Sequence, residues 1–237
     1  MIFTKDHRTA WDDAKLGVVF GFYGGYCNAA AVVLLLHEIS PMSANWGGMA
    51  KALGNMDISK VFTFLPLILC FITGAFFGAK WAKKGSPLSV VILEAALLVS
   101  TALIAKEHII FAIGIGGLTM GLQNGMSTQL THHRVRTTHL TSTVTDIGIS
   151  LARRDYKDVL VKGSKTITFI WGAFVGAFKA NLLGHLAFAF GGLYLFAVTL
   201  IVQILLPRCA GCLERDSLLR EWFSKPSAAL SQITTEN

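Results

Sequence analysis

The sequence predicts an all-α, polytopic helical membrane protein with six transmembrane helices and two short polar segments. The chain has 237 residues, of which 53% are hydrophobic and only 15% charged, whereas soluble domains carry about 25% charged residues. Its apolar residues also gather in runs of roughly 18 or more, which is the length that crosses about 30 Å of hydrocarbon as a helix. Composition and run length therefore indicate the same class.

The uncharged runs are interpreted in chain order as six spans. The third run is interrupted only by Glu94, and the fifth contains Lys179. Tight returns follow the second and third runs, at Gly85-Ser-Pro87 and Lys106-Glu-His108, and proline in the first of them cannot continue the preceding helix. The six predicted spans are Leu16–Leu36, Val61–Ala79, Leu88–Ala105, Ile109–Met126, Thr166–Leu183 and His185–Leu206.

These spans place a single transmembrane domain over residues 16–206, between two polar ends. Residues 1–15 form an amino-terminal arm and residues 207–237 a carboxy-terminal tail. The tail begins near Cys209-Ala-Gly-Cys212, which lacks the further ligands of a metal site. A lipidated thiol pair beside the membrane is the simpler alternative.

Two polar segments interrupt the apolar pattern and form the candidate site. Thr137–Asp146 crowds hydroxyl groups and one carboxylate into ten residues, and Ser40–Asn45 is a shorter version in the first half. As half-helices that start in the middle of the bilayer, with Ser43 and Thr141 at N-cap positions, they would offer unpaired N–H groups and partial positive charge to a polar solute. Ordinary surface loops are the alternative.

The two halves of the chain resemble each other, over residues 16–105 and 109–206. Three segments recur in the same order, two at an offset of 98 residues and one at 96. Three crossings in each half would give the halves opposite orientations, which is the 3+3 inverted repeat of many transporters. The matched segments are Gly74–Ala79 with Gly172–Ala177, Ser43–Asn45 with Thr141–Thr143, and Gly25–Asn28 with Gly121–Asn124.

Glycines four residues apart predict close helix packing. Gly74 with Gly78, and Gly172 with Gly176, each form a GxxxG step, which leaves one helix face nearly bare backbone. We expect these two helices to pack on each other or on the polar segments.

The basic residues predict the orientation. With six spans, 17 of the 21 Lys and Arg residues, including Lys165, fall on the side of both termini and four on the other. Because basic loops stay in the cytoplasm, both termini are expected there. Eight full spans, with a weaker split of 15 against six, are the alternative.

Several function classes find no support in the sequence. It has no HExxH, GxSxG or nucleotide-binding loop, so we expect no enzyme, catalytic residue or cofactor. His132, His133 and His139 lack metal spacing, and a basic loop that touches anionic lipid explains them better than a metal does. The net charge of +7 comes without a nucleic-acid-binding motif.

Charged residues inside or beside the spans are further candidates. A carboxylate within the membrane, such as Glu94, is costly and functional by default, although a pair with Lys83 or Lys84 would explain it as well. Asp146 is expected to face protein or water, and a helix end exposed to the cytoplasm is its alternative. Its predicted partners are Thr143, Thr145 or a basic residue such as Arg136 or Arg153.

Paired asparagines complete the candidate set. Asn28 and Asn124 fit solute contact or hydrogen bonds between helices equally well. The candidate solute-binding residues are Asn28, Ser43, Asn45, Glu94, Asn124, Thr138, Thr141, Thr143 and Asp146.

Four motifs, Gly25–Ala29, Ser40–Asn45, Gly121–Asn124 and Thr137–Gly148, resemble the YoaK / DUF1275 (UPF0700) family of bacterial inner-membrane proteins. The resemblance runs from about Gly17 to Leu206 and implies a location and an architecture rather than an activity. The family usually has Asp in place of Asn28 and His in the segment at 40–45, so the first half of this chain lacks two titratable groups.

The sequence therefore predicts a transporter or channel for a small polar solute, which is passive or driven by an ion gradient. Its expected partners are the lipid bilayer and the unidentified solute, and a homo-oligomer stays open. A non-transporting membrane scaffold or assembly partner is the alternative function.

Overall fold

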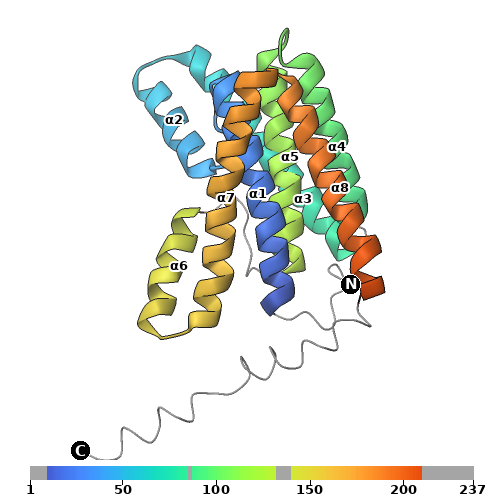
Figure 1. The fold of residues 1–237 in the computed structure, drawn as a ribbon. Helices are drawn as coiled ribbons and strands as arrows, with labels where there is room; N and C mark the ends of the chain where they lie inside the picture. Colours follow the sequence, from blue (N-terminus) through green and yellow to red (C-terminus); the bar gives the residue numbers. More distant parts are fainter. Residues whose placement is uncertain (1–9, 85–86, 132–139, 210–237) are drawn as a thin grey trace, which may run out of the picture. The chain divides into compact units, whose positions relative to one another are not determined.

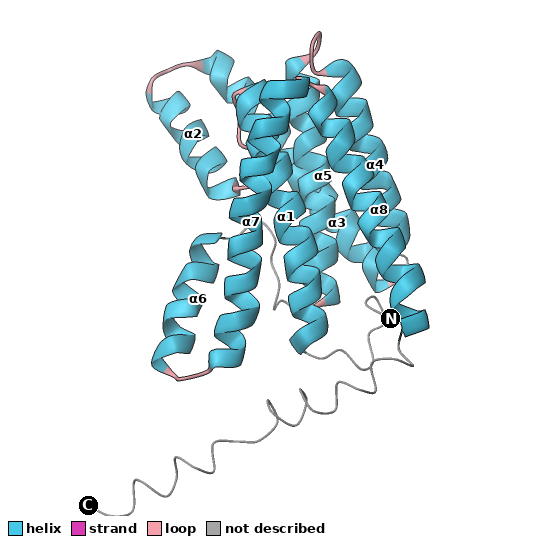
Figure 2. Cartoon of the chain, in the orientation of Figure 1, coloured by secondary structure: helices cyan, strands magenta, loops and turns pink. Residues whose placement is uncertain are grey.

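The computed structural model describes the backbone of residues 10–84, 87–131 and 140–209, and the side chains of 14–84, 87–131 and 140–201. All regular structure in these residues is α-helical, as predicted (Figures 1 and 2). Of these residues, 10–200 lie in one compact unit and 201–209 belong to another. The helices are α1 (Ala10–Leu35), α2 (Met42–Gly54), α3 (Ile58–Lys83), α4 (Pro87–Ile104), α5 (Ile109–Leu130), α6 (Leu140–Ala152), α7 (Tyr156–Leu183) and α8 (Leu186–Cys209).

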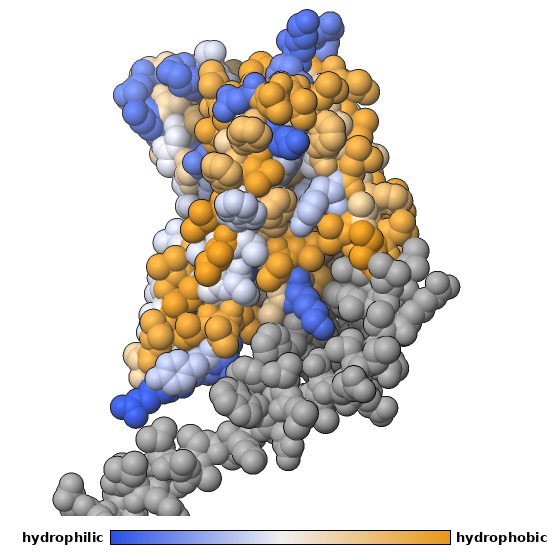
Figure 3. Space-filling model, viewed as in Figure 1, coloured by the Kyte–Doolittle hydropathy of each residue, from blue (hydrophilic) through white to orange (hydrophobic). Residues whose placement is uncertain are grey.

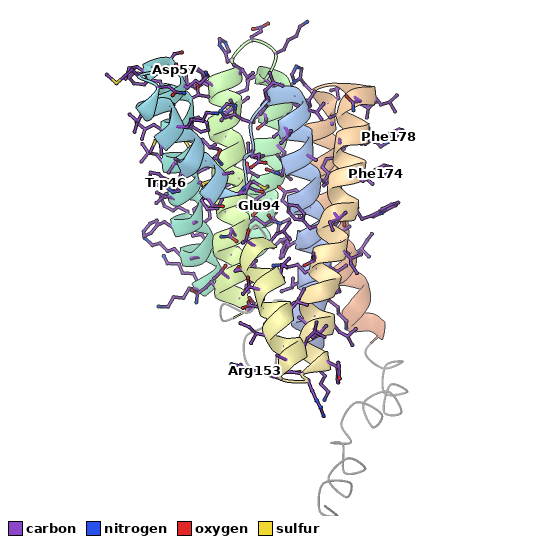
Figure 4. The ribbon with its side chains drawn as sticks, turned by 90° about the vertical axis from the view of Figure 1, so that its left-hand side faces the viewer. Trp46, Asp57, Glu94, Arg153, Phe174 and Phe178 are labelled. Atoms are coloured by element: carbon purple, nitrogen blue, oxygen red, sulfur yellow. The ribbon has the colours of Figure 1, made fainter. Side chains whose placement is uncertain are left out.

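Five of these helices, α1, α3, α4, α5 and α7, are long and apolar enough to cross a membrane. The sixth predicted span corresponds to α8, whose Leu186–Ile201 part is a shorter apolar helix within the residues searched. Apolar side chains cover much of the face in Figure 3, and Phe174 and Phe178 of α7 point outward in Figure 4. An apolar outer surface of this extent suits lipid rather than water.

The largest difference from the predicted spans is at the start of α7. This helix begins at Tyr156, ten residues before the predicted Thr166, because the Asp155 side chain accepts a hydrogen bond from the Asp158 N–H and caps it. Lys165 therefore lies inside α7 and is only 4% exposed. The predicted start of this span, after Lys165, was therefore wrong.

α3 and α7 begin in the same way at positions 98 residues apart. Met56 and Arg154 take positive φ angles of 55° and 56°, and the aspartate that follows each caps the helix. A hydrogen bond from the Lys60 side chain, and a second from its backbone N–H, lower the pKa of the Asp57 carboxyl.

The two polar segments lead into short helices of equal length. α2 and α6 each have 13 residues, or about 20 Å, which is too short to cross a bilayer. The predicted N-caps were wrong. Pro41 occupies the N-cap of α2 without a side-chain cap bond, and Ser43 and Thr141 lie inside the helices.

Two helix pairs dominate the packing, since α1 packs on α7 and α3 on α5. α3 and α7 also pack on the short helices α2 and α6, as predicted. Their GxxxG glycines, however, lie in the contacts with α5 and α1. A Cβ added at Gly78 would overlap the carbonyl oxygen of Leu122, and one at Gly176 that of Tyr26. The backbones of the paired helices therefore touch.

Both helix pairs make equivalent glycine contacts. Each glycine contact between α1 and α7 recurs between α3 and α5 when one partner is shifted by 96 residues and the other by 98. The equivalent contacts are Gly25 on Phe169 and Gly121 on Phe71, Gly74 on Leu118 and Gly172 on Phe22, and Gly78 on Leu122 and Gly176 on Tyr26.

We predict that Gly176→Ala lowers the thermal unfolding midpoint, because the added methyl group forces α7 away from α1 at a cost of about 1–3 kcal/mol. Gly163→Ala is the matched control in the same helix, where nothing lies within 4 Å of an added Cβ. It should be neutral or stabilise the helix by up to about 1 kcal/mol. Equal midpoints for both variants in detergent would contradict the close contact.

Candidate functional site

The short helices α2 and α6 both start near mid-height of the bundle. In Figure 4, Trp46 near the start of α2 lies close to the level of Glu94, whereas Asp57, just beyond its end, lies at the upper end. Arg153, just beyond α6, lies at the opposite end, and α6 occupies the half of the bundle below α2 in Figure 1. Two helix amino termini, with their unpaired N–H groups, are thus directed toward the middle.

Two asparagines hold the non-helical segment 36–41 that precedes α2. The Asn28 side-chain oxygen accepts hydrogen bonds from the backbone N–H groups of Ile39 and Ser40, both at 3.1 Å. The Asn45 amide donates back to a carbonyl oxygen of the same segment at 2.9 Å. Backbone without helical bonds is tolerated at membrane depth only where protein groups or a water-filled cavity satisfy it. Asn28 and Asn45 provide such groups here.

Thr143 and Lys165 form a buried polar contact between α6 and α7. Their exposed fractions are 5% and 4%, and the Lys165 ammonium donates to the Thr143 hydroxyl at 2.6 Å. Thr143 is equivalent to Asn45 at the offset of 98, and Leu67 stands at the position equivalent to Lys165. Through Thr143, the fourth residue of α6, the ammonium lies beside the first turn of that helix and adds to the positive end of its dipole. This contact therefore favours negative or strongly polar groups.

Asp146 lies at the outer edge of this region, in a network between α6 and α7. Its carboxylate is 3.8 Å from the Lys162 ammonium, which is 2.5 Å from Asp158. Ser150 completes the network through a short hydrogen bond with Asp158. The Asp146 side chain is 50% exposed, and its charged partner among the described residues is Lys162, a basic residue as predicted although not one of the two that were named. Of those, Arg136 lies outside the described residues.

Several other candidate solute-binding residues take no part in these contacts. Ser43 and Thr141 are exposed on α2 and α6. The Asn124 side-chain oxygen has no hydrogen-bond partner in the described part of the chain. Thr138 and the side chains of Cys209 and Cys212 lie outside that part.

Glu94 belongs to a second buried polar cluster. It is 0% exposed, and neither carboxylate oxygen has a hydrogen-bond partner among the described residues. The ion pair with a neighbouring lysine that the sequence left open is therefore not formed. Tyr23 and Cys27 of α1, both 0% exposed, lie within electrostatic range of Glu94. Gln123 of α5 reaches the same helix, donating to a backbone carbonyl of α1 at 3.1 Å.

Sequence reasoning missed Lys165, Tyr23 and Gln123. The last two were treated as ordinary members of apolar spans, and Lys165 as a loop residue. A usable signal was present in the comparison of the two halves. Lys165 aligns with Leu67 and Gln123 with Cys27, so in each case a strongly polar group replaces a less polar one at an equivalent position.

Within the described residues, no three His, Cys, Asp or Glu side chains come close enough to hold a metal ion. The histidines considered above, His132, His133 and His139, lie outside those residues.

The fold and these clusters define a helical protein of the membrane type with polar groups buried between its helices. Residues 16–206 match the family model described as "Protein of unknown function (DUF1275)". The chain belongs to this family, which confirms the resemblance to DUF1275. No curated protein and no solved structure matches the chain.

We predict that Asn28→Leu destabilises the protein, because each buried N–H left without an acceptor costs about 1–3 kcal/mol. Asn28→Asp keeps an acceptor at the same place and should stay closer to the wild type. Asn181→Leu, at an exposed position of α7, serves as the control in thermal unfolding. If Asn28→Leu unfolds at the temperature of this control, Asn28 does not hold the segment.

Proposed function

We propose that the chain is a small integral membrane transporter or channel for a small polar solute. The observation that carries the proposal is the pair of short helices, α2 and α6, whose amino termini are directed toward mid-height beside buried polar side chains. In membrane proteins, discontinuous helices of this kind supply substrate sites near the bilayer middle. The proposal includes no catalytic residue, metal or cofactor.

The contact of Thr143 with Lys165 is the proposed centre of the solute site. Burying a hydroxyl and an ammonium carries a free-energy cost that a purely structural helix contact avoids. A solute with a negative or hydrogen-bond-accepting group would be attracted by the ammonium and by the α6 amino terminus together. Asp146 and Lys162 lie at the outer edge of this site.

A screen of ligand-dependent thermal stabilisation, with carboxylates, amino acids and inorganic anions, tests the site. Thr143→Val removes the buried hydroxyl with little change of shape and should abolish any stabilisation that the wild type shows. Thr145→Val is the matched control on α6, because its hydroxyl is exposed and bonds only the Thr141 carbonyl. A ligand that stabilises both variants equally binds elsewhere.

We further propose six spans arranged as a 3+3 inverted repeat in a bacterial inner membrane, with both termini cytoplasmic. The equivalent glycine contacts and the two 13-residue helices support the repeat. The α2–α3, α4–α5 and α7–α8 connections lie together at one end in Figure 1. Without Lys165, 16 basic residues fall on the side of the termini and four on the other, so the bias remains.

Reporter fusions at Asn55, Glu107 and Leu183 should all give extracytoplasmic signals, because these residues stand at or beside the three connections. A fusion at Arg153, in the α6–α7 turn, should give the opposite signal. A cytoplasmic signal at Glu107 would overturn the proposed topology.

A non-transporting membrane scaffold or assembly partner, as a monomer or a homo-oligomer, is the second candidate. One observation favours it. The Asn28 oxygen and the Asn45 amide are occupied by backbone groups, so part of the polar set has a structural role. A scaffold would show no solute-dependent stabilisation in the same screen.

A further inference from the structure

We propose that Glu94 binds a monovalent cation, either a proton or Na⁺, in a site enclosed by α1, α4, α5 and α8. The inference concerns a different cluster from the solute site and does not depend on solute transport. It rests on the complete burial of Glu94 and on the absence of a hydrogen-bond partner for both of its oxygens among the described residues.

An isolated carboxylate inside a helix bundle carries a high free-energy cost. Glu94 is the eighth residue of α4, about 10 Å along the helix from its first residue. An ionised carboxylate buried without a partner costs several kcal/mol even after the protein relaxes. A cation of charge +1 removes this cost by neutralising the group, and within membrane helices such carboxylates commonly mark ion pathways.

Two further polar side chains, those of Tyr23 and Gln123, are buried on or against α1. The Gln123 side-chain oxygen is also buried without a partner in the described part of the chain, and the buried Tyr23 hydroxyl has only the Cys27 thiol beside it there. Tyr23 lies in electrostatic range of Glu94. Hydroxyl, amide and carboxylate oxygens are the donors that hard cations such as Na⁺ prefer. A proton needs the carboxylate alone.

Glycines close the cluster on the side of α8. A Cβ at Gly191 would press on Tyr26 and Cys27, and one at Gly192 on the Ala95 backbone of α4. α8 can therefore approach both helices closely and shield the site from lipid. The single carboxylate matches a monovalent ion in charge, and no three metal-binding side chains gather here among the described residues.

The titratable groups around Glu94 are few. α1 contributes Tyr23 and Cys27, and α5 the neutral Gln123. Cys70 of α3 lies against Gly114 of α5. On α8, the Tyr194 ring packs on Phe22. Tyr26 of α1 lies beside Cys27 against Gly191. A pH response lost on substitution of Glu94 can thus be separated from the responses of three tyrosines and two cysteines.

Thermal unfolding of the purified full-length protein tests the site in two arms. One arm compares NaCl with choline chloride at equal ionic strength and fixed pH, and the other varies pH without Na⁺. Because a ligand that binds only the folded form stabilises it, the midpoint should rise with Na⁺ if the ligand is Na⁺, or with proton concentration if it is a proton. Glu94→Gln should abolish the shift, whereas Glu107→Gln, in the exposed α4–α5 turn, should keep it.

Labelling of the wild type with a hydrophobic carbodiimide, which modifies protonated carboxyl groups, covers the case in which Glu94→Gln fails to fold. Modification at Glu94, located by mass spectrometry, should slow as pH rises, and Na⁺ should slow it further only if Na⁺ binds. Tyr23→Phe should weaken a Na⁺ effect several-fold. Glu94→Gln with an unchanged response to both pH and Na⁺ would overturn the proposal, as would a wild type whose Glu94 stays unmodified at every pH.

Discussion

The close approach of helix backbones at glycine is the constraint on which this structure depends. α1 meets α7, and α3 meets α5, through positions where any side chain would overlap a carbonyl oxygen. Each pair consists of one helix from the first half of the chain, before residue 106, and one helix from the second half. The two halves of the chain therefore share one core, and neither half forms these contacts by itself. Van der Waals contact between bare backbones is effective in lipid, where apolar burial no longer drives helices together.

The short helices follow from the same arrangement. The long helices supply the side chains that satisfy the irregular backbone beside them, as Asn28 of α1 does for the segment before α2. On each short helix the two buried residues are seven apart, Asn45 and Ala52 on α2 and Thr143 and Ser150 on α6. Since seven residues are about two helical turns, each helix buries one narrow face. Polar groups on that face are enclosed by the core rather than by water.

The helical class, the family and the two polar segments could be predicted from the sequence, because run length and composition report them directly. Helix ends were less predictable. α7 begins ten residues before its apolar part, and Lys165 is the last of these ten residues. Hydropathy cannot separate a polar helix end of this kind from a loop. The partners of the glycine faces were also not predicted, since GxxxG shows that a face is bare but not which helix meets it. The burial of Glu94, Tyr23 and Gln123 together depends on contacts between α1, α4 and α5, which no local pattern contains.

Some positions that are equivalent in the two halves carry different residues. These differences show which side chains the helix packing requires and which it does not. Leu67 packs against Gly117 as Lys165 packs against Gly21, so an apolar side chain suffices for this helix contact and the ammonium is not required by it. Glu94 likewise has Gly192 as its equivalent, which shows that the corresponding position accepts a residue without any polar group. Each of these charges carries a desolvation cost, and the packing shared by the two halves does not offset it. Binding of a charged or polar ligand offsets such a cost, and we therefore assign the proposed cation site to Glu94, whereas the Lys165 ammonium already has protein contacts, among them the Thr143 hydroxyl.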